Sequence, residues 1–218
     1  MRTQLLVVAK WPEPGRVKTR LCPPATPVQA ARIAAAALAD TLDTVRRAPA
    51  YRRMLVLDGD PARGLPVPGA DAVPVVRQRG DGLAERLVHA FADTASGGDG
   101  SVLVGMDTPQ VRAEHLAAAR SALGTADAVL GPAADGGWWL LGLRDPADAA
   151  VLADVPMSTS DTGAVTLAAL RDRGRRVALL PVLRDVDTAA DAVTVARQCP
   201  DSRFAAAVAA ELSPAVPA

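Results

Sequence analysis

Short apolar runs alternate along the chain with longer stretches that are rich in alanine. The apolar runs are continuous, which is typical of strands in a sheet that is covered on both faces. Seven runs are predicted as strands, namely Leu5–Ala9, Met54–Leu57, Val73–Val76, Val102–Val104, Ala128–Leu130, Trp138–Leu143 and Val177–Leu180. Six stretches are predicted as helices, namely Pro27–Arg47, Gly82–Thr94, Arg112–Leu123, Thr162–Arg173, Ala189–Gln198 and Arg203–Leu212. This alternation predicts an α/β fold with one Rossmann-like, mostly parallel sheet and helices on both faces.

No linker divides the 218 residues, so we expect a single domain over residues 1–218, with a disordered tail over residues 213–218. The start of the first long helix is well marked. Thr26 suits the N-cap, and Pro27 suits the first helical position, where no backbone donor is needed.

Composition excludes several classes of partner. The formal net charge is zero and aromatic residues make up 3% of the chain, which argues against nucleic acid as a partner. No apolar run approaches the ~20 residues of a membrane span, and no signal peptide is recognisable, so a cytoplasmic protein is expected. The two cysteines form no metal-binding or redox pair. An apolar helix or the C-terminal segment could pair two copies, so a homodimer is possible.

The lysines are concentrated in one place. Of the 24 Lys and Arg residues only two are lysines, and both Lys10 and Lys18 follow the first predicted strand, together with Arg16 and Arg20. A strand that opens into a cationic loop with Pro and Gly, here Gly15, is a common way to hold phosphates. A solvated basic turn is the alternative. The retention of lysine in a chain that otherwise uses arginine favours a phosphate site.

Acidic residues follow two of the predicted strands, and ligands in open α/β sheets bind beyond the carboxyl ends of strands. Asp107 stands at such an end, where it would suit Mg²⁺, an ion that takes one or two carboxylates plus phosphate oxygens. Capping of a helix that starts near Pro109 is the alternative. Further along, Asp185 has no evident structural role and is a metal candidate. Either Asp187 or Thr188 is predicted to cap the helix from Ala189, with Asp187 preferred.

A turn of the type Asp135-Gly136-Gly137 precedes two of the three tryptophans. The turn alone could explain the glycines. Adjacent residues of a strand point to opposite faces, so we expect one of Trp138 and Trp139 in the core and the other at a pocket.

Together these motifs resemble a bacterial family of glycosyltransferase-A-fold proteins of the nucleotide-diphospho-sugar transferase-like type. Six segments carry the resemblance in order: AKWPEPGRVKTRL, QRGDGLAERL, GMDTP, GPAADGGWWLLGL, MSTSDTGAVTLAAL and LRDVDTAAD. Parts also resemble 2-phospho-L-lactate guanylyltransferases. The resemblance implies that Lys18 and Arg20 bind nucleotide phosphates and that Asp107 and Asp185 bind the metal. The Gly-Gly-rich first loop of the wider nucleotidyltransferases is absent.

The function that follows is Mg²⁺-dependent transfer of a nucleoside monophosphate from an NTP to a small phosphorylated acceptor, with release of pyrophosphate. Transfer from a nucleotide-sugar donor and nucleotide binding without catalysis are the alternatives. Predicted catalytic residues are Lys18, Arg20 and Asp107. Predicted nucleotide-binding residues are Lys10, Gly15, Arg16, Lys18, Arg20, Glu85, Arg86, Asp135, Gly136 and Gly137. Predicted ligands of Mg²⁺, or of Mn²⁺ in its place, are Asp107, Asp185 and Asp187.

Overall fold

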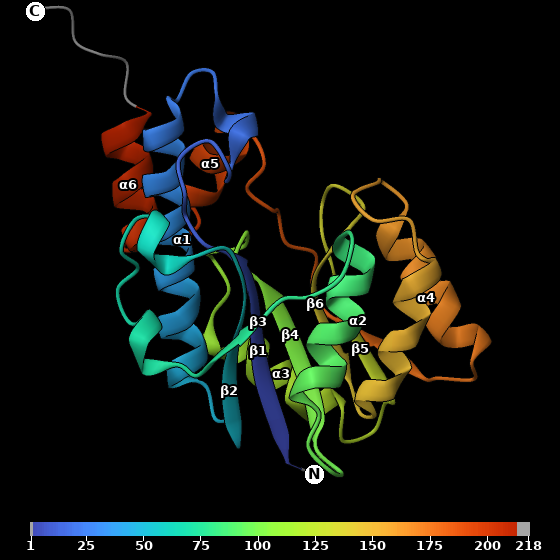
Figure 1. Ribbon diagram of the computed structural model, residues 1–218. Helices are drawn as coiled ribbons and strands as arrows, with labels where there is room; N and C mark the ends of the chain where they lie inside the picture. The colour runs from blue at the N-terminus through green and yellow to red at the C-terminus, as the bar shows by residue number, and fades with distance from the viewer. Residues whose placement is uncertain (1, 213–218) are drawn as a thin grey trace, which may run out of the picture.

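A computed structural model describes residues 2–212 of the chain (Figure 1). The predicted tail at 213–218 lies outside the described residues. The fold centres on one seven-stranded sheet with the strand order β3-β2-β1-β4-β6-β5-β7. Its strands are β1 (Thr3–Lys10), β2 (Arg52–Asp58), β3 (Val75–Arg77), β4 (Gly100–Gly105), β5 (Ala128–Pro132), β6 (Trp138–Leu143) and β7 (Val177–Leu179). The prediction of a mostly parallel α/β sheet is confirmed.

The sheet departs from parallel at β6, which runs antiparallel to both β4 and β5. The connection between β5 and β6 spans only residues 133–137. A parallel crossover needs about a dozen residues or more, so a link this short can only form a hairpin. The remaining pairs, β1 with β2 and β4, β2 with β3, and β5 with β7, are parallel.

Helices cover both faces of the sheet (Figure 1). They are α1 (Pro27–Arg47), α2 (Leu83–Thr94), α3 (Ala113–Ala122), α4 (Thr162–Asp172), α5 (Ala189–Ala196) and α6 (Arg203–Glu211). Helices α1 and α3 pack on one face, and α2 and α4 pack on the other with the 3₁₀ helix η4 (Pro146–Asp154). A third apolar cluster joins α5 and α6 to the outer side of α1. No helix among residues 2–212 is both long and apolar enough to cross a membrane.

Local signals in the sequence explain where several elements begin. Thr26 is the N-cap of α1 and forms a capping box with Gln29, and Pro27 is the first helical residue, as predicted. The predicted strand at residues 73–76 begins later, at Val75. The reason is that Val73 closes the 3₁₀ helix η3 (Ala70–Ala72), which periodicity did not reveal.

Candidate active site

A cavity of about 690 Å³ opens at the carboxyl ends of β1 and β4. Its volume lies within the range of small-molecule sites, and its position is where open α/β sheets bind ligands. Ten of the residues predicted from the sequence line it: Lys10, Arg16, Lys18, Arg20, Arg86, Asp107, Asp135, Gly137, Asp185 and Asp187. Three do not: Gly15, Glu85 and Gly136. Glu85 instead accepts a hydrogen bond from the backbone of Asp81, at 2.7 Å, and so shapes the loop before α2.

Lys18 is held inside the protein rather than on a solvated loop. Its side chain is only 7% exposed, and its Nζ lies 2.6 Å from Asp107 Oδ1 and also donates to the carbonyl oxygen of Val186. Its backbone is left-handed, with φ 48°. Within residues 2–212 only Lys18 and Ser158 combine a side chain with positive φ, and both line the cavity. Strained backbone of this kind collects at functional sites.

The other cations of the loop at residues 10–20, called here the cationic loop, each face a carboxylate. Arg20 pairs with Asp187 at 2.8 Å, and Lys10 lies 4.0 Å from Asp58. Arg16 pairs within the loop with Glu13, at 3.5 Å. From outside the loop, Arg86 of α2 shares Asp58, at 3.0 Å. Asp58 ends β2 and was missed at the sequence level, although its place at a strand end was a usable signal.

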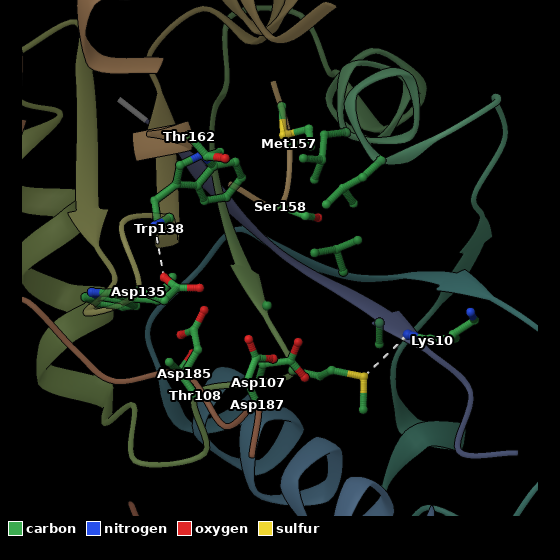
Figure 2. Close-up of a pocket in the computed structure, with 18 of the residues that line it drawn as sticks. Lys10, Asp107, Thr108, Asp135, Trp138, Met157, Ser158, Thr162, Asp185 and Asp187 are labelled. Atoms are coloured by element: carbon green, nitrogen blue, oxygen red, sulfur yellow. Dashed lines mark hydrogen bonds between the residues drawn. The ribbon is translucent and has the colours of Figure 1, made fainter. Parts of the chain in front are cut away.

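Asp185, at the centre of the site, forms no ion pair with any Lys or Arg of the described residues. Its Oδ1 atom is buried with no hydrogen-bond partner among the described residues. Burial, and after it the negative charges of Asp107, Asp135 and Asp187, raise the pKa of Asp185 to about 7, against the opposing charge of Lys18. Figure 2 shows these four carboxylates gathered at one end of the cavity. A cation that bound there would satisfy the orphaned oxygen and favour the ionised form.

The donor set fits a hard divalent ion. Among the described residues no group of three or more His, Cys, Asp or Glu side chains is already arranged to hold a metal. Mg²⁺ does not need such a cage, because it usually takes one or two carboxylates and completes its shell with water and substrate phosphates. Asp107 and Asp185, with the orphaned oxygen of Asp185, are the residues that fit this role.

Two structural roles weighed from the sequence prove wrong. Asp107 does not cap a helix near Pro109, because α3 begins at Ala113 with Arg112 as its N-cap. Asp187 does not cap α5. The N-cap is the other residue predicted for this position, Thr188, whose side chain accepts from the backbone of Asp191 in a capping box. Asp187 is therefore available to pair with Arg20. Val186, which lies between Asp185 and Asp187, donates its backbone N–H to the carbonyl oxygen of Asp107, at 2.9 Å.

Two segments, 135–139 and 157–162, form a further wall of the cavity, called here the hydroxyl wall. They are pressed together at Gly136, where a Cβ atom would lie 1.9 Å from the carbonyl oxygen of Ser160. The backbone N–H of Gly163 donates to the carbonyl of Gly136 at 2.8 Å, and that of Gly137 donates to Asp135 Oδ1 at 2.9 Å. The turn is thus fixed by a neighbouring segment as well as by its own hairpin.

The tandem tryptophans divide as predicted. Trp139 is buried in the core and its indole N–H donates to the carbonyl of Pro181, at 3.1 Å. Trp138 is half-buried and lies at the edge of the cavity beside Asp135 (Figure 2). The 157–162 segment, with Ser158, was recognised in the sequence only as part of a family motif and was given no role. Its hydroxyls carry no distinctive pattern that would have marked it.

The sheet, the cavity at its carboxyl edge and the carboxylates there place the chain in the class of nucleotide-diphospho-sugar transferase folds. The chain belongs to a family described as "Uncharacterized protein conserved in bacteria (DUF2064)", whose model matches residues 41–159. The predicted family resemblance is confirmed.

Solved structures support the same class. A protein from Desulfovibrio desulfuricans G20, provisionally named a nucleotide-diphospho-sugar transferase, is 30% identical, with a TM-score of 0.82, over 95% of this chain and 94% of that chain. Rv0371c from Mycobacterium tuberculosis H37Rv, solved in complex with manganese, is 22% identical, with a TM-score of 0.56, over 89% and 98%.

A 4-diphosphocytidyl-2C-methyl-D-erythritol synthase is 14% identical, with a TM-score of 0.62, over 91% of this chain and 100% of that chain. At these lower identities the likeness establishes the fold alone. No curated protein matches the chain. The family and the fold thus identify a transferase architecture, and the choice of reaction depends on the site.

Proposed function

We propose that the protein is a divalent-metal-dependent nucleotidyltransferase, in which an acceptor oxygen attacks the α-phosphorus of an NTP and pyrophosphate leaves. The observation that carries the proposal is the meeting of the cationic loop with two carboxylates, Asp107 and Asp185, at one end of a single cavity. Catalysis of this kind needs no protein nucleophile, since positioning and charge stabilisation suffice.

The cationic loop would hold the triphosphate. Lys10, Arg16, Lys18 and Arg20 all line the cavity, and each of their acidic partners can release them to a more highly charged ligand. An ammonium ~4 Å from a phosphate oxygen contributes ~4 kcal/mol at an effective dielectric of ~20. Lys18 is the member with the least freedom, because its ammonium is enclosed and its backbone is fixed in a left-handed turn.

The metal would be held by Asp107 and Asp185. When bound, a divalent ion supplies positive charge against the phosphate oxygens in the transition state. The proposal draws support from the orphaned oxygen of Asp185, which is buried with no hydrogen-bond partner among the described residues. Asp187 stays a weaker candidate, since Arg20 already neutralises it.

Transfer of a sugar from a nucleotide-sugar is the second candidate. It is favoured by the 30% identity to the Desulfovibrio protein, whose provisional name implies a nucleotide-diphospho-sugar donor. The number of cations in the loop favours a triphosphate over a diphosphate. Binding without catalysis is the third candidate, and intact Lys18, Asp107 and Asp185 argue against it.

A thermal-shift panel of NTPs and nucleotide-sugars, each with and without Mg²⁺, tests the proposal. A ligand at ~100 times its Kd stabilises the folded state by ~2.7 kcal/mol. We expect an NTP with Mg²⁺ to give the largest shift, and Asp107→Asn and Asp185→Asn to remove its Mg²⁺-dependent part. Stabilisation by nucleotide-sugars alone would favour the glycosyltransferase alternative.

Lys18→Arg is the sharpest variant for the same proposal. It keeps the charge but replaces a compact ammonium by a planar fork in an enclosed position, so we expect pyrophosphate release to fall by at least ~10-fold, or ~1.4 kcal/mol. Arg46→Lys, on an exposed pair with Asp43, is the matched control and should have no effect. Full activity in Lys18→Arg would contradict the role given to Lys18.

A further inference from the structure

The charges that line the cavity are strongly segregated. All five lining cations come from the cationic loop or from α2, and each lies within 4.0 Å of a carboxylate. The hydroxyl wall contributes no cation among the described residues that line the cavity. It offers one carboxylate, Asp135, the half-buried face of Trp138, and the hydroxyls of Ser158, Thr159 and Ser160.

Asp135 is as notable as the missing cation. No Lys or Arg among the described residues lies within ion-pair distance of it, and its carboxylate accepts a hydrogen bond from the backbone N–H of Gly137. Figure 2 places its carboxylate inside the cavity, between Asp185 and Trp138 and on the side away from Lys10. A dianionic phosphate next to Asp135 would meet a carboxylate that no Lys or Arg among the described residues neutralises.

The geometry points to the hydroxyl wall as the acceptor site of the proposed nucleotidyltransferase, for an uncharged molecule that carries several hydroxyl groups. This inference rests on the proposed function and replaces the phosphorylated acceptor predicted from the sequence. Hydroxyls on the ligand donate to Asp135 and exchange hydrogen bonds with the wall hydroxyls, while its C–H face packs on Trp138.

Asp135 then has a chemical role. In the transfer step the acceptor hydroxyl oxygen forms a bond to the α-phosphorus, and the bond from that phosphorus to the bridging oxygen breaks. The electron pair of that bond leaves with pyrophosphate, and the hydroxyl proton passes to the Asp135 carboxylate. An ionised phosphate acceptor would need no such base, so a carboxylate here fits a hydroxyl nucleophile.

The rigid construction of the wall supports a positioning role. Gly136 lies against the Ser160 carbonyl too closely for any side chain, and Ser158 is held at φ 60°. Contacts of this kind fix both segments relative to β6, and through β6 relative to Asp107, which follows the neighbouring strand β4. An acceptor bound to the wall is thereby held at a fixed distance from the carboxylates.

The test compares matched pairs of compounds that differ only by a phosphate: glycerol and glycerol 3-phosphate, ribitol and ribitol 5-phosphate, glucose and glucose 6-phosphate. Binding is measured by saturation-transfer NMR on the full chain with Mg²⁺ and a non-hydrolysable NTP, and turnover by pyrophosphate release with the NTP itself. We expect at least one neutral compound to bind, and its phosphate to bind at least ~10-fold more weakly, or ~1.4 kcal/mol.

Variants separate chemistry from structure. Asp135→Asn keeps the acceptor for Gly137 N–H, so it should fold normally and lower turnover by at least ~100-fold. Asp154→Asn, an exposed aspartate outside the cavity, is the control and should change nothing. Ser160→Lys adds a cation to the wall and should shift preference toward the phosphorylated partner of each pair.

Binding by none of the neutral compounds, tighter binding of their phosphates, or an unchanged Asp135→Asn would each overturn the inference. Failure of every NTP to bind would instead refute the proposed function. In that case the same pairs, measured on the nucleotide-free protein, still decide whether the wall prefers neutral compounds. An amine analogue such as 3-amino-1,2-propanediol that binds better than glycerol would show that Asp135 binds a cationic group. That result would also overturn the inference of a neutral acceptor.

Discussion

The cationic loop and the hydroxyl wall border the same cavity, but the first is held by charges and the second by backbone contact. In the loop, Lys18 and Arg20 meet Asp107 and Asp187, so their side chains are placed by partners that a charged ligand can replace. In the wall, Gly136 meets the Ser160 carbonyl, and the segments cannot part without loss of packing. The loop is therefore suited to a polyanion that arrives with its own counter-ion, and the wall to a neutral molecule recognised by shape.

The contrast predicts different sensitivity to a single added methyl group. Gly136→Ala places a Cβ atom 1.9 Å from the Ser160 oxygen at φ +92°, so we expect a loss of roughly 3 kcal/mol in the free energy of unfolding. Gly15→Ala, in the cationic loop, has φ +79° but no atom within 4 Å, and should cost only about 1 kcal/mol. Urea denaturation measures both. Equal losses would mean that the wall is no more tightly built than the loop.

Most of the fold was predictable because continuous apolar runs mark buried strands. All seven strands and all six α-helices of the described residues overlap the ranges that hydrophobic patterning predicted, although β3 begins two residues late, and Thr26 starts α1 as its side-chain chemistry requires. The antiparallel β6 was within reach of the sequence, since the link at residues 133–137 is too short for a crossover. The 3₁₀ helix η4 was missed because its short, irregular turns carry no clear period.

The cationic loop and the hydroxyl wall also differ in how far the sequence predicted them. The cationic loop was predictable because two lysines among many arginines are visible in composition. The enclosure of Lys18 was not, since it depends on Val186 and Asp107 arriving from distant parts of the chain. The hydroxyl wall was not predictable as a unit, because contact between Gly136 and Ser160 joins two segments whose serines and glycines look like ordinary turns.

Asp185 lies between the two regions, and its raised pKa makes the stability of the protein depend on pH. The pKa of about 7 in the folded state exceeds the ordinary value of about 3.9 in the unfolded chain. As pH rises from about 4 to about 7, the unfolded chain loses this proton first, so the free energy of unfolding falls. Asp185→Asn lacks the effect and should be more stable than wild type by ~1–2 kcal/mol at pH 8 in EDTA.

At pH 4 the advantage of Asp185→Asn should nearly vanish, because the carboxyl is then protonated in the folded state and about half protonated in the unfolded chain. Asp154→Asn, at an exposed position outside the cavity, is measured alongside as the control for removal of a carboxylate. An advantage of equal size at pH 4 and pH 8 would show that the Asp185→Asn substitution stabilises the protein by something other than the removal of a buried negative charge.

The smallest expected effect is on Asp187, and it tests whether this residue acts through its exposed ion pair with Arg20 or through the backbone of α5. Its partner Arg20 is well exposed, so Asp187→Ala should cost less than ~0.5 kcal/mol, and 1 M NaCl should remove even that. Thr188→Ala removes the N-cap of α5 and should cost about 1 kcal/mol at any salt concentration. Chemical denaturation at low and high salt separates the two. A larger loss in the free energy of unfolding for Asp187→Ala that does not depend on salt would contradict this assignment. It would show that Asp187 stabilises α5 as a helix cap and not through its ion pair with Arg20.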